Sequence, residues 1–489
     1  MEPSSHRNQG RILLIYPQTR CQLGSADIQG GGVSLNRLVP PLGLLYIATA
    51  LLKEGYDVKF IDFSVDTYSL DKLHKLIKDI DLVGISVLGE NRIFALQLAK
   101  DIKGFDRNVQ IIFGGPEITM NPELSEEVDA IVLGEAESQI VSIVNCLLSG
   151  KSLSDCNGVI YKDGRTGEAI KTSFPLVERD LNSIEFPARE LVNRSKYTVF
   201  APFFRGKWAS IITSRGCPSG CIFCSWPSSK FHPYRSRSAD NVIKEIQSIY
   251  KDGYRFLYVV DSNFLVDLTR AKLIAEGVIQ SGIDLRMTIL GRVDSANKEL
   301  YIRLREAGVR IIGFGLESGD QETLNYLNKN TTVEQNRYAV ELTNQCGMYS
   351  HGHFMIGVPN ETRTHIERTI SFAKSIPLDT AFFHLFTIRK GSTLWNKFHT
   401  NGLIESPEDG ILATRERGLG NLSKDELIDL QRKAYKEYYG RPSFWIRQLK
   451  KAIHLRDSRF TLLTLAAGVA FFRQKTTYKI QKYFRKPVG

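Results

Sequence analysis

Three of the seven cysteines stand within eight residues of one another, at Cys217, Cys221 and Cys224. Thiolates at the spacing C-x3-C-x2-C on one loop can converge on three corners of an iron–sulfur cube. A fully ligated [4Fe–4S] cluster usually takes four cysteines. The other cysteines of this chain are distant in sequence: Cys21, Cys146, Cys156 and Cys346. The spacing therefore favours a three-cysteine cluster with one iron open to a substrate or cofactor.

Two other uses of this motif stay open. One is a zinc site completed by a distant His or Cys, and the other is an electron-transfer cluster closed by a fourth cysteine. A disulfide scaffold is excluded, because seven cysteines in 489 residues are too sparse for one.

Alternating strand and helix patterns fill the 150 residues at the N-terminus. Apolar strand-like runs are expected at 11–17, 57–63, 81–88, 109–116 and 129–135, with helical patterns at 40–56, 69–80, 91–103 and 137–150. Near-continuous apolar strands between helices predict a parallel sheet covered on both faces. This is a doubly wound, Rossmann-like α/β domain, whose ligand crevice lies at the carboxyl ends of the strands. The residues expected there are Gln18, Thr19, Ser86, Gly114, Gly115 and Gly134.

A hairpin and linker are expected over 151–208, followed by a second alternating block over 209–400. Its strands are expected at 209–216, 254–261, 285–292, 310–318, 349–357 and 380–388, and its helices at 239–252, 267–281, 297–307, 333–346 and 364–375. Six units are fewer than the eight of a closed barrel, so we predict a partial (β/α)6 TIM-type barrel. The cysteine motif follows its first strand, at the end where barrel chemistry is found. Residues 401–489 are expected to be a helical region with a basic tail.

The positive net charge of +11 belongs to that tail. The segment from Arg441 to Gly489 holds twelve Lys or Arg and one acid, Asp457, so the rest of the chain is neutral. A neutral body without a recognisable nucleic-acid module argues against nucleic-acid binding. Large apolar residues interleave with the tail's charges: Phe444, Trp445, Ile446, Leu449, Phe460–Phe472, Tyr478, Ile480, Tyr483 and Phe484. This pattern predicts peripheral contact with anionic lipid, unless the apolar side simply covers the barrel.

Targeting signals are not apparent in the sequence. The N-terminus has no apolar signal-peptide core, and the charge-free run Phe460–Phe472 is shorter than the about 20 residues that span a bilayer. We therefore expect a cytoplasmic protein, with possible peripheral contact to the membrane through the tail.

With these elements in place, the chain from about Arg11 to Arg441 resembles the radical SAM superfamily, in the branch with an N-terminal cobalamin-binding domain. The motifs that carry the resemblance, in order, are SRGCPSGCIFCSW, VVDSNF, GRVD, GFGLESG, KNTT and FMIGVPNET. That branch includes methylases, oxidative cyclases of the Mg-protoporphyrin ester type and lipid-modifying enzymes. The resemblance implies that the reduced cluster cleaves S-adenosylmethionine to a 5′-deoxyadenosyl radical, which takes hydrogen from an unactivated carbon.

The resemblance also implies a role for individual residues. Cys217, Cys221 and Cys224 would hold the cluster, and Phe223 would pack near the adenine. Asp261 would lie near the methionine amino group, where the commoner GGE triplet is absent. Further positions toward S-adenosylmethionine are Glu317, Ser318, Ile356 and Gly357. Capping or close packing is the alternative for these acids and glycines.

Cobalamin is implied for the N-terminal domain, with Ser86, Gly114, Gly115 and Gly134 against the corrin. The Asp-x-His-x-x-Gly motif that supplies a cobalt-ligating histidine is absent, and no His occurs between His6 and His74. Many members of this branch also lack that histidine, so we expect cobalt without a protein ligand. The alternative is a degenerate domain that only packs against the barrel.

Three functions fit these expectations. The first is a cobalamin-dependent C-methyltransferase, and the second is a radical cyclase or carbon–carbon coupling enzyme. The third is a non-catalytic iron–sulfur or corrin-binding partner protein, which an open cluster site disfavours. The expected partners are a small-molecule or lipid substrate and an electron donor such as flavodoxin or ferredoxin, without nucleic acid. S-adenosylhomocysteine separates the first two functions, because it forms only with methyl transfer.

Overall fold

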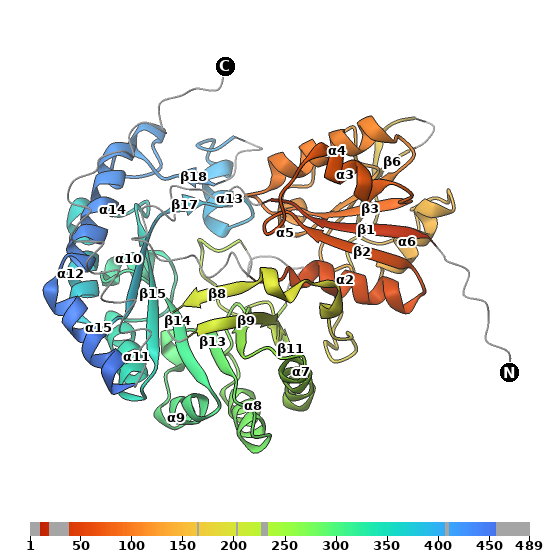
Figure 1. Ribbon diagram of the computed structural model, residues 1–489. Helices are drawn as coiled ribbons and strands as arrows, with labels where there is room; N and C mark the ends of the chain where they lie inside the picture. Colours follow the sequence, from red (N-terminus) through yellow and green to blue (C-terminus); the bar gives the residue numbers. More distant parts are fainter. Residues whose placement is uncertain are drawn as a thin grey trace.

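The computed structural model contains two large sheets, each built mainly of parallel strands (Figure 1). It describes residues 10–18, 39–163, 166–201, 204–225, 233–405 and 410–455. The first sheet and its helices form the red and orange part of Figure 1, and the second sheet runs from yellow at β8 and β9 through green to cyan. The mixed α/β architecture predicted from the sequence is confirmed.

The first sheet has the strand order β2-β1-β3-β4-β5-β6-β7. Its parallel strands are β1 (Arg11–Tyr16), β2 (Asp57–Asp62), β3 (Leu82–Ser86), β4 (Gln110–Gly114) and β5 (Ala130–Val132). The helices between them are α2 (Leu42–Lys53), α3 (Leu70–Ile77), α4 (Arg92–Phe105), α5 (Pro116–Met120) and α6 (Ile140–Leu148). Apolar residues are buried on both faces of the sheet, as the near-continuous strands predicted. This order reverses at β1 and β3, where doubly wound folds bind ligands.

The expected hairpin after residue 150 extends this sheet instead of standing apart in a linker. Strands β6 (Val159–Lys162) and β7 (Ala169–Lys171) add antiparallel to the edge, where β6 pairs with the side of β5 that β4 leaves free. The connecting arm then leads to β8 (Thr198–Ala201) at the start of the second sheet.

The second sheet contains six consecutive parallel strands and has the order β16-β15-β14-β13-β12-β9-β8. The parallel strands are β9 (Phe204–Ile211), β12 (Phe256–Val259), β13 (Arg286–Gly291), β14 (Val309–Glu317), β15 (Tyr349–Ile356) and β16 (Thr380–Leu385). The helices are α7 (Ala239–Lys251), α8 (Leu268–Gln280), α9 (Lys298–Glu306), α10 (Gln321–Tyr326), α11 (Val333–Gln345) and α12 (Arg363–Ser375). This is the expected six-unit barrel, but β9 begins five residues before Ala209 and pairs antiparallel with β8.

Short polar side chains cap the N-termini of these helices, at the points where strand-like sequence gives way to helical sequence. Ser238, Asp267 and Asn297 each accept a hydrogen bond from a backbone N–H of the first turn of α7, α8 and α9. Thr332 and Gln335 form a reciprocal capping box at α11. These caps fix each helix start just after a strand end, which positions the loops that carry the site.

A small group of elements follows the last barrel strand. It contains β17 (Thr387–Ile388), α13 (Thr393–Thr400) and β18 (Ile411–Leu412), which surround a separate apolar cluster that includes Trp395. The C-terminal helices α14 (Lys424–Tyr439) and α15 (Pro442–His454) then run along the outside of the barrel (Figure 1).

The described part of the basic tail packs on the barrel. On α15, Phe444 is buried and Lys451 forms a buried ion pair with Asp379, N···O 2.7 Å. Arg447 donates to the carbonyl of Leu378. Leu378 and Asp379 precede β16, so α15 lies at the end of the barrel opposite to the cysteine loop. For α15, the apolar side therefore covers the barrel, which was the alternative to lipid contact. Phe460–Phe472 and the residues after this run fall outside the described part of the chain. None of the described helices is long and apolar enough to cross a membrane.

Candidate active site

The cysteine motif lies on the segment that joins two short antiparallel strands, β10 (Ser214–Arg215) and β11 (Arg235–Ser236). Cys217, Cys221 and Cys224 all line one cavity of about 390 Å³ at the carboxyl ends of the barrel strands. Backbone and side chains from the ends of β13, β14 and β15 complete its wall, including Gly291, Gly313, Gly315 and His353. The three thiols predicted to act together are therefore brought to one wall.

The other described cysteines are elsewhere. Cys146 and Cys156 lie in the first sheet's helical layer, and Cys346 ends α11; Cys21 falls outside the described residues. Among the described residues that line the cavity, no further Cys is present. Three thiols with space beside them suit a cluster that keeps one coordination position for a ligand.

Two cations, the partly buried Arg292 and the buried Lys329, line the same cavity as the thiols. Arg292 Nη1 is 3.7 Å from Cys221 Sγ, and the same guanidinium donates to the carbonyl of Lys329 at 2.7 Å. Lys329 Nζ pairs with Glu317 Oε1 at 2.9 Å and lies 5.9 Å from the centre of the Phe223 ring. Arg292 and Lys329 belong to the GRVD and KNTT motifs but were not singled out from the sequence.

Two of the expected S-adenosylmethionine positions line the same cavity, Phe223 and Glu317. Glu317 has a backbone φ of 62°, in the left-handed region that non-glycine residues rarely adopt, at a register shift between β14 and β15. Strain of this kind is retained where the surroundings over-determine it, commonly at functional sites. The twist turns the Glu317 carboxylate toward Lys329.

Asp261 lies under the cysteine segment and is fully buried. Its carboxylate accepts hydrogen bonds from the backbone N–H of Thr213 at 2.6 Å and from the hydroxyls of Thr213 and Ser214. Burial raises the pKa of Asp261, and these hydrogen bonds oppose that effect. The expected contact with a methionine amino group stays a prediction, because the geometry uses both oxygens to fix the strand that leads into the motif.

Ser318, Ile356 and Gly357 also lie outside the described lining of the cavity. Ser318 Oγ is 2.8 Å from the hydroxyl of Thr369, and Ile356 is completely buried. Gly357 has φ +91°, and a Cβ there would stand 2.8 Å from Leu427. Their proposed roles toward the adenine or ribose stay predictions, whereas their packing roles are visible.

Glu361 holds the turn after β15 from behind. Its Oε2 accepts from the backbone N–H groups of Gly357 and Val358 at 2.8 and 3.0 Å, and burial raises its pKa to about 8. Its unfolded form ionises near 4.5. Between these values the folded state binds more protons than the unfolded state, so stability falls as pH rises and then levels off above about 8.

Glu361→Gln should therefore flatten the pH dependence of the thermal unfolding midpoint. The wild type should lose stability relative to the variant by up to about 1.4 kcal/mol per pH unit between about pH 5 and about pH 8. Differential scanning calorimetry at several pH values measures this difference. Equal slopes in the two proteins would show that Glu361 is already ionised in the fold.

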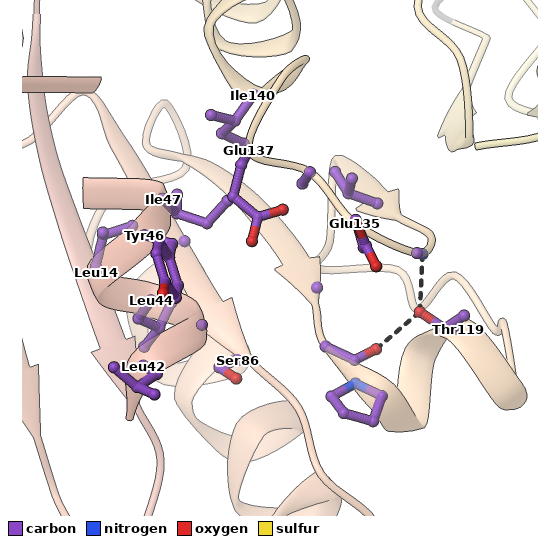
Figure 2. Close-up of a pocket in the computed structure, with 18 of the residues that line it drawn as sticks. Leu14, Leu42, Leu44, Tyr46, Ile47, Ser86, Thr119, Glu135, Glu137 and Ile140 are labelled. Carbon is purple, nitrogen blue, oxygen red and sulfur yellow. Dashed lines mark hydrogen bonds between the residues drawn. The ribbon is translucent and has the colours of Figure 1, made fainter. Parts of the chain in front are cut away.

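A second cavity, of about 430 Å³, lies between the first sheet and the barrel (Figure 2). All four residues expected against a corrin line it: Ser86, Gly114, Gly115 and Gly134. Of the other two expected at the crevice, Gln18 follows β1 without lining this cavity, and Thr19 falls outside the described residues. The rest of the wall is mostly aliphatic, with Leu14, Leu44 and Ile140 among the side chains in Figure 2. No histidine is among the described residues that line it.

Glycine is required at the rim of this cavity for steric reasons. Gly115 has φ +110°, and a Cβ there would lie 2.7 Å from the carbonyl of Val87. Thr119 accepts a hydrogen bond from the N–H of Gly134 at 2.9 Å and donates to the carbonyl of Gly115, which ties the two loops together (Figure 2). The result is a backbone-lined edge that a large flat ligand can approach closely, as a corrin requires.

The two cavities meet. Ser262 lines both of them, and the segment Arg215–Gly216 on the wall of the larger cavity leads directly to Cys217 in the smaller one. The two cavities are therefore adjacent and share Ser262 on their walls.

A pair of histidines at the barrel mouth was missed from the sequence. His353 Nδ1 and His384 Nε2 lie 3.0 Å apart on β15 and β16, and their rings stack with Phe382. Burial lowers the pKa of His353 to about 3, so this residue is neutral at physiological pH. The sequence signal that could have pointed to His353 is the alternation His351-x-His353, because residues two apart in a strand lie on the same face.

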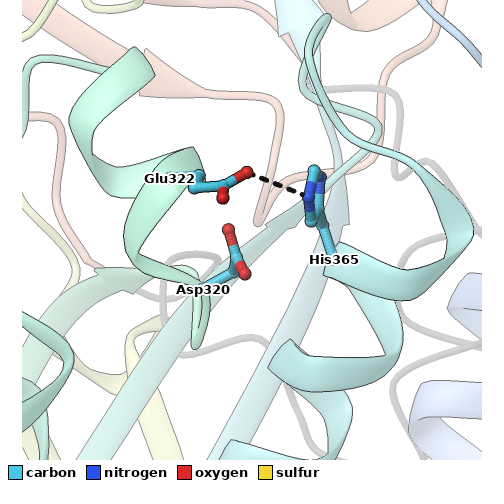
Figure 3. Close-up of side chains that lie close together, drawn as sticks. All are labelled: Asp320, Glu322 and His365. Atoms are coloured by element: carbon cyan, nitrogen blue, oxygen red, sulfur yellow. Dashed lines mark ion pairs between the residues drawn. The ribbon is translucent and has the colours of Figure 1, made fainter.

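A carboxylate–histidine group of Asp320, Glu322 and His365 lies outside these cavities (Figure 3). Asp320 caps α10 and pairs with Arg368, while His365 accepts from the N–H of Thr362 and pairs with Glu322. These contacts account for the group as capping and ion pairing.

Comparison with known proteins agrees with the geometry. Residues 211–373 match the radical SAM superfamily, and residues 29–144 match the B12 binding domain. A Pyrococcus horikoshii relative, described as an uncharacterized methyltransferase, is 31% identical over 449 residues, covering 90% of this chain and 94% of the relative. The chain belongs to the cobalamin-binding branch of the radical SAM superfamily. Its cofactors are accordingly a [4Fe–4S] cluster, S-adenosylmethionine and cobalamin.

Other relatives of this radical SAM enzyme include a cyclase and a methylase. The anaerobic magnesium-protoporphyrin IX monomethyl ester cyclase of Cereibacter sphaeroides is 27% identical, over 88% of this chain and 70% of the relative. The hopanoid C-3 methylase of Methylococcus capsulatus is 26% identical, over 63% of this chain and 59% of the relative.

Solved structures share the fold. The cobalamin-dependent radical enzyme OxsB, with aqua-cobalamin and S-adenosylmethionine bound, superposes with a TM-score of 0.69 at 17% identity, over 94% of this chain and 70% of the other. The methyltransferase TsrM from Kitasatospora setae, with cobalamin and a [4Fe–4S] cluster bound, gives 0.64 at 18% identity, over 81% and 76%.

Proposed function

We propose that this enzyme transfers a methyl group to an unactivated carbon of a hydrophobic, lipid-like or natural-product substrate. The observation that carries the proposal is that Ser262 lines both cavities, so the corrin face and the cysteine cavity adjoin. A substrate carbon held at this junction is within reach of both. The methyltransferase and methylase names among the relatives support the same choice.

When bound, the cluster and S-adenosylmethionine supply a 5′-deoxyadenosyl radical, and cobalamin supplies the methyl group. The chain's own residues bind and orient. Cys217, Cys221 and Cys224 would hold the cluster, and Arg292 contacts the Cys221 sulfur. Phe223 and the Glu317–Lys329 pair offer an aromatic face and fixed charges to S-adenosylmethionine. A flavodoxin or ferredoxin is the proposed reductant.

The test is anaerobic incubation of the reconstituted enzyme with S-adenosylmethionine, a reductant and lipid or metabolite extracts. Methyl transfer predicts both 5′-deoxyadenosine and S-adenosylhomocysteine, with a substrate product heavier by one methylene. A product made with 5′-deoxyadenosine but without S-adenosylhomocysteine would instead support a radical cyclase, the second candidate, which the cyclase relatives favour.

We further propose a peripheral membrane contact through residues 456–489 alone, because α15 belongs to the barrel. The full-length protein should float with liposomes containing anionic lipid at low salt, and a chain ending at Leu455 should not. Each basic side chain near such a surface adds on the order of 1 kcal/mol. Cutting at 455 leaves the Lys451–Asp379 pair intact, and equal flotation of both chains would contradict the contact.

A further inference from the structure

Both ends of the cysteine-bearing segment are bound by one carboxylate from the other sheet. Arg235, on β11, forms a two-pronged ion pair with Glu135, with Nη1–Oε2 3.0 Å and Nη2–Oε1 2.5 Å. Arg215, on β10, reaches the same Oε2 at 2.9 Å. Glu135 follows β5 of the first sheet, so this contact, the Glu135 bridge, joins the corrin-binding unit to the cluster loop.

The bridge is shielded from water. The exposed fractions of the Arg215, Glu135 and Arg235 side chains are 11%, 12% and 8%. Arg215 also pairs with Glu137 at 2.6 Å, so two carboxylates balance two guanidinium groups. Separating such a group would leave charges buried without partners, which is strongly unfavourable. The two loop ends must therefore follow Glu135 when it moves.

Glu135 also lines the larger cavity. Gly134, Glu135 and Glu137 line that cavity, together with Arg215. A ligand that packs against the loop after β5 restricts the position of Glu135. Through Arg215, two residues before Cys217, and Arg235, beyond Cys224, that restriction reaches both ends of the thiol-bearing segment.

We propose that Glu135 is a positioning residue that couples occupancy of the corrin cavity to the stability of the cluster loop. The inference rests on the proposed cofactor sites and adds that binding at one of them stabilises the other. Cobalamin bound in one cavity holds the cluster in the other, and by reciprocity the loaded cluster favours cobalamin.

The experiment measures how fast an iron chelator removes iron from the anaerobically reconstituted enzyme, with and without hydroxocobalamin. In the wild type, hydroxocobalamin should slow iron loss by about fivefold or more, the usual lower range of coupling between sites. In Glu135→Gln the two rates should agree within about twofold. The rates are compared within one protein and at saturating hydroxocobalamin, with its binding to the variant verified by absorbance, so neither a general loss of stability nor weaker cobalamin binding imitates the effect.

Matched variants make the result specific. Glu185→Gln breaks the exposed Lys53–Glu185 pair, lies outside the described lining of both cavities, and should keep the protection. Arg235→Gln removes the ion pair at one end of the loop and should lose the protection. This variant replaces Glu135→Gln in the experiment if Glu135→Gln does not fold. Equal protection in wild type and Glu135→Gln, or equal loss in Glu185→Gln, would overturn the assignment. Absence of hydroxocobalamin binding to the wild type would instead overturn the proposed function.

Discussion

Replacing Cys217, Cys221 or Cys224 by Ala should abolish both the iron–sulfur cluster and the cleavage of S-adenosylmethionine. The anaerobically purified wild type should be brown and hold about four irons per chain. Because the described residues of the cavity wall include three thiols, loss of one leaves too few ligands to retain the cube. Iron analysis, the absorbance of the cluster and 5′-deoxyadenosine formation measure the three consequences.

The control variants are Cys146→Ala, Cys156→Ala and Cys346→Ala, whose thiols lie away from the cavity. They should keep iron and cleavage activity. Loss of the cluster in the Cys346 variant would mean that a fourth cysteine ligates it, and the open coordination position would then be wrong.

Replacing Gly114 by Val should lower cobalamin affinity by at least about tenfold, or about 1.4 kcal/mol, while leaving the fold intact. A Cβ at Gly114 would meet only the carbonyl of Val132, at 3.9 Å, so the protein has room for it. The larger side chain would instead enter the cavity where the corrin is expected. Absorbance titration with hydroxocobalamin measures the affinity, and the wild type should retain about one cobalamin per chain.

Gly115→Val supplies the contrast, because its Cβ would collide with backbone and its φ is positive. This variant should lose thermal stability, whereas Gly114→Val should not, and Gly114→Val should still cleave S-adenosylmethionine. Unchanged cobalamin binding in Gly114→Val would place the corrin elsewhere. A protein imidazole signal on cobalt would contradict the expectation of an unligated lower face.

The sequence by itself determined the elements and the metal-binding motif. The cysteines lie close together in the chain, so their spacing alone restricts what they can bind. Near-continuous apolar runs between helical patterns identified the six barrel units and the parallel N-terminal sheet, because strands of a parallel sheet are buried on both faces. Strand ends in a parallel sheet share one edge, and that rule placed Ser86, Gly114, Gly115 and Gly134 on one cavity.

Only the tertiary structure decided which side chains meet across those elements. Asp261 stands at a strand end as expected, yet its oxygens are directed to Thr213 and Ser214 beneath the loop. The His353–His384 pair depends on the register of β15 against β16.

The helix α15 has the composition of a membrane-surface helix, but its Lys451 forms a buried ion pair with Asp379 on the barrel. Glu135 is one carboxylate among many in the sequence, and its role follows from two arginines that lie 80 and 100 residues further along the chain. Contacts over such separations depend on how the two sheets dock, which no local period encodes.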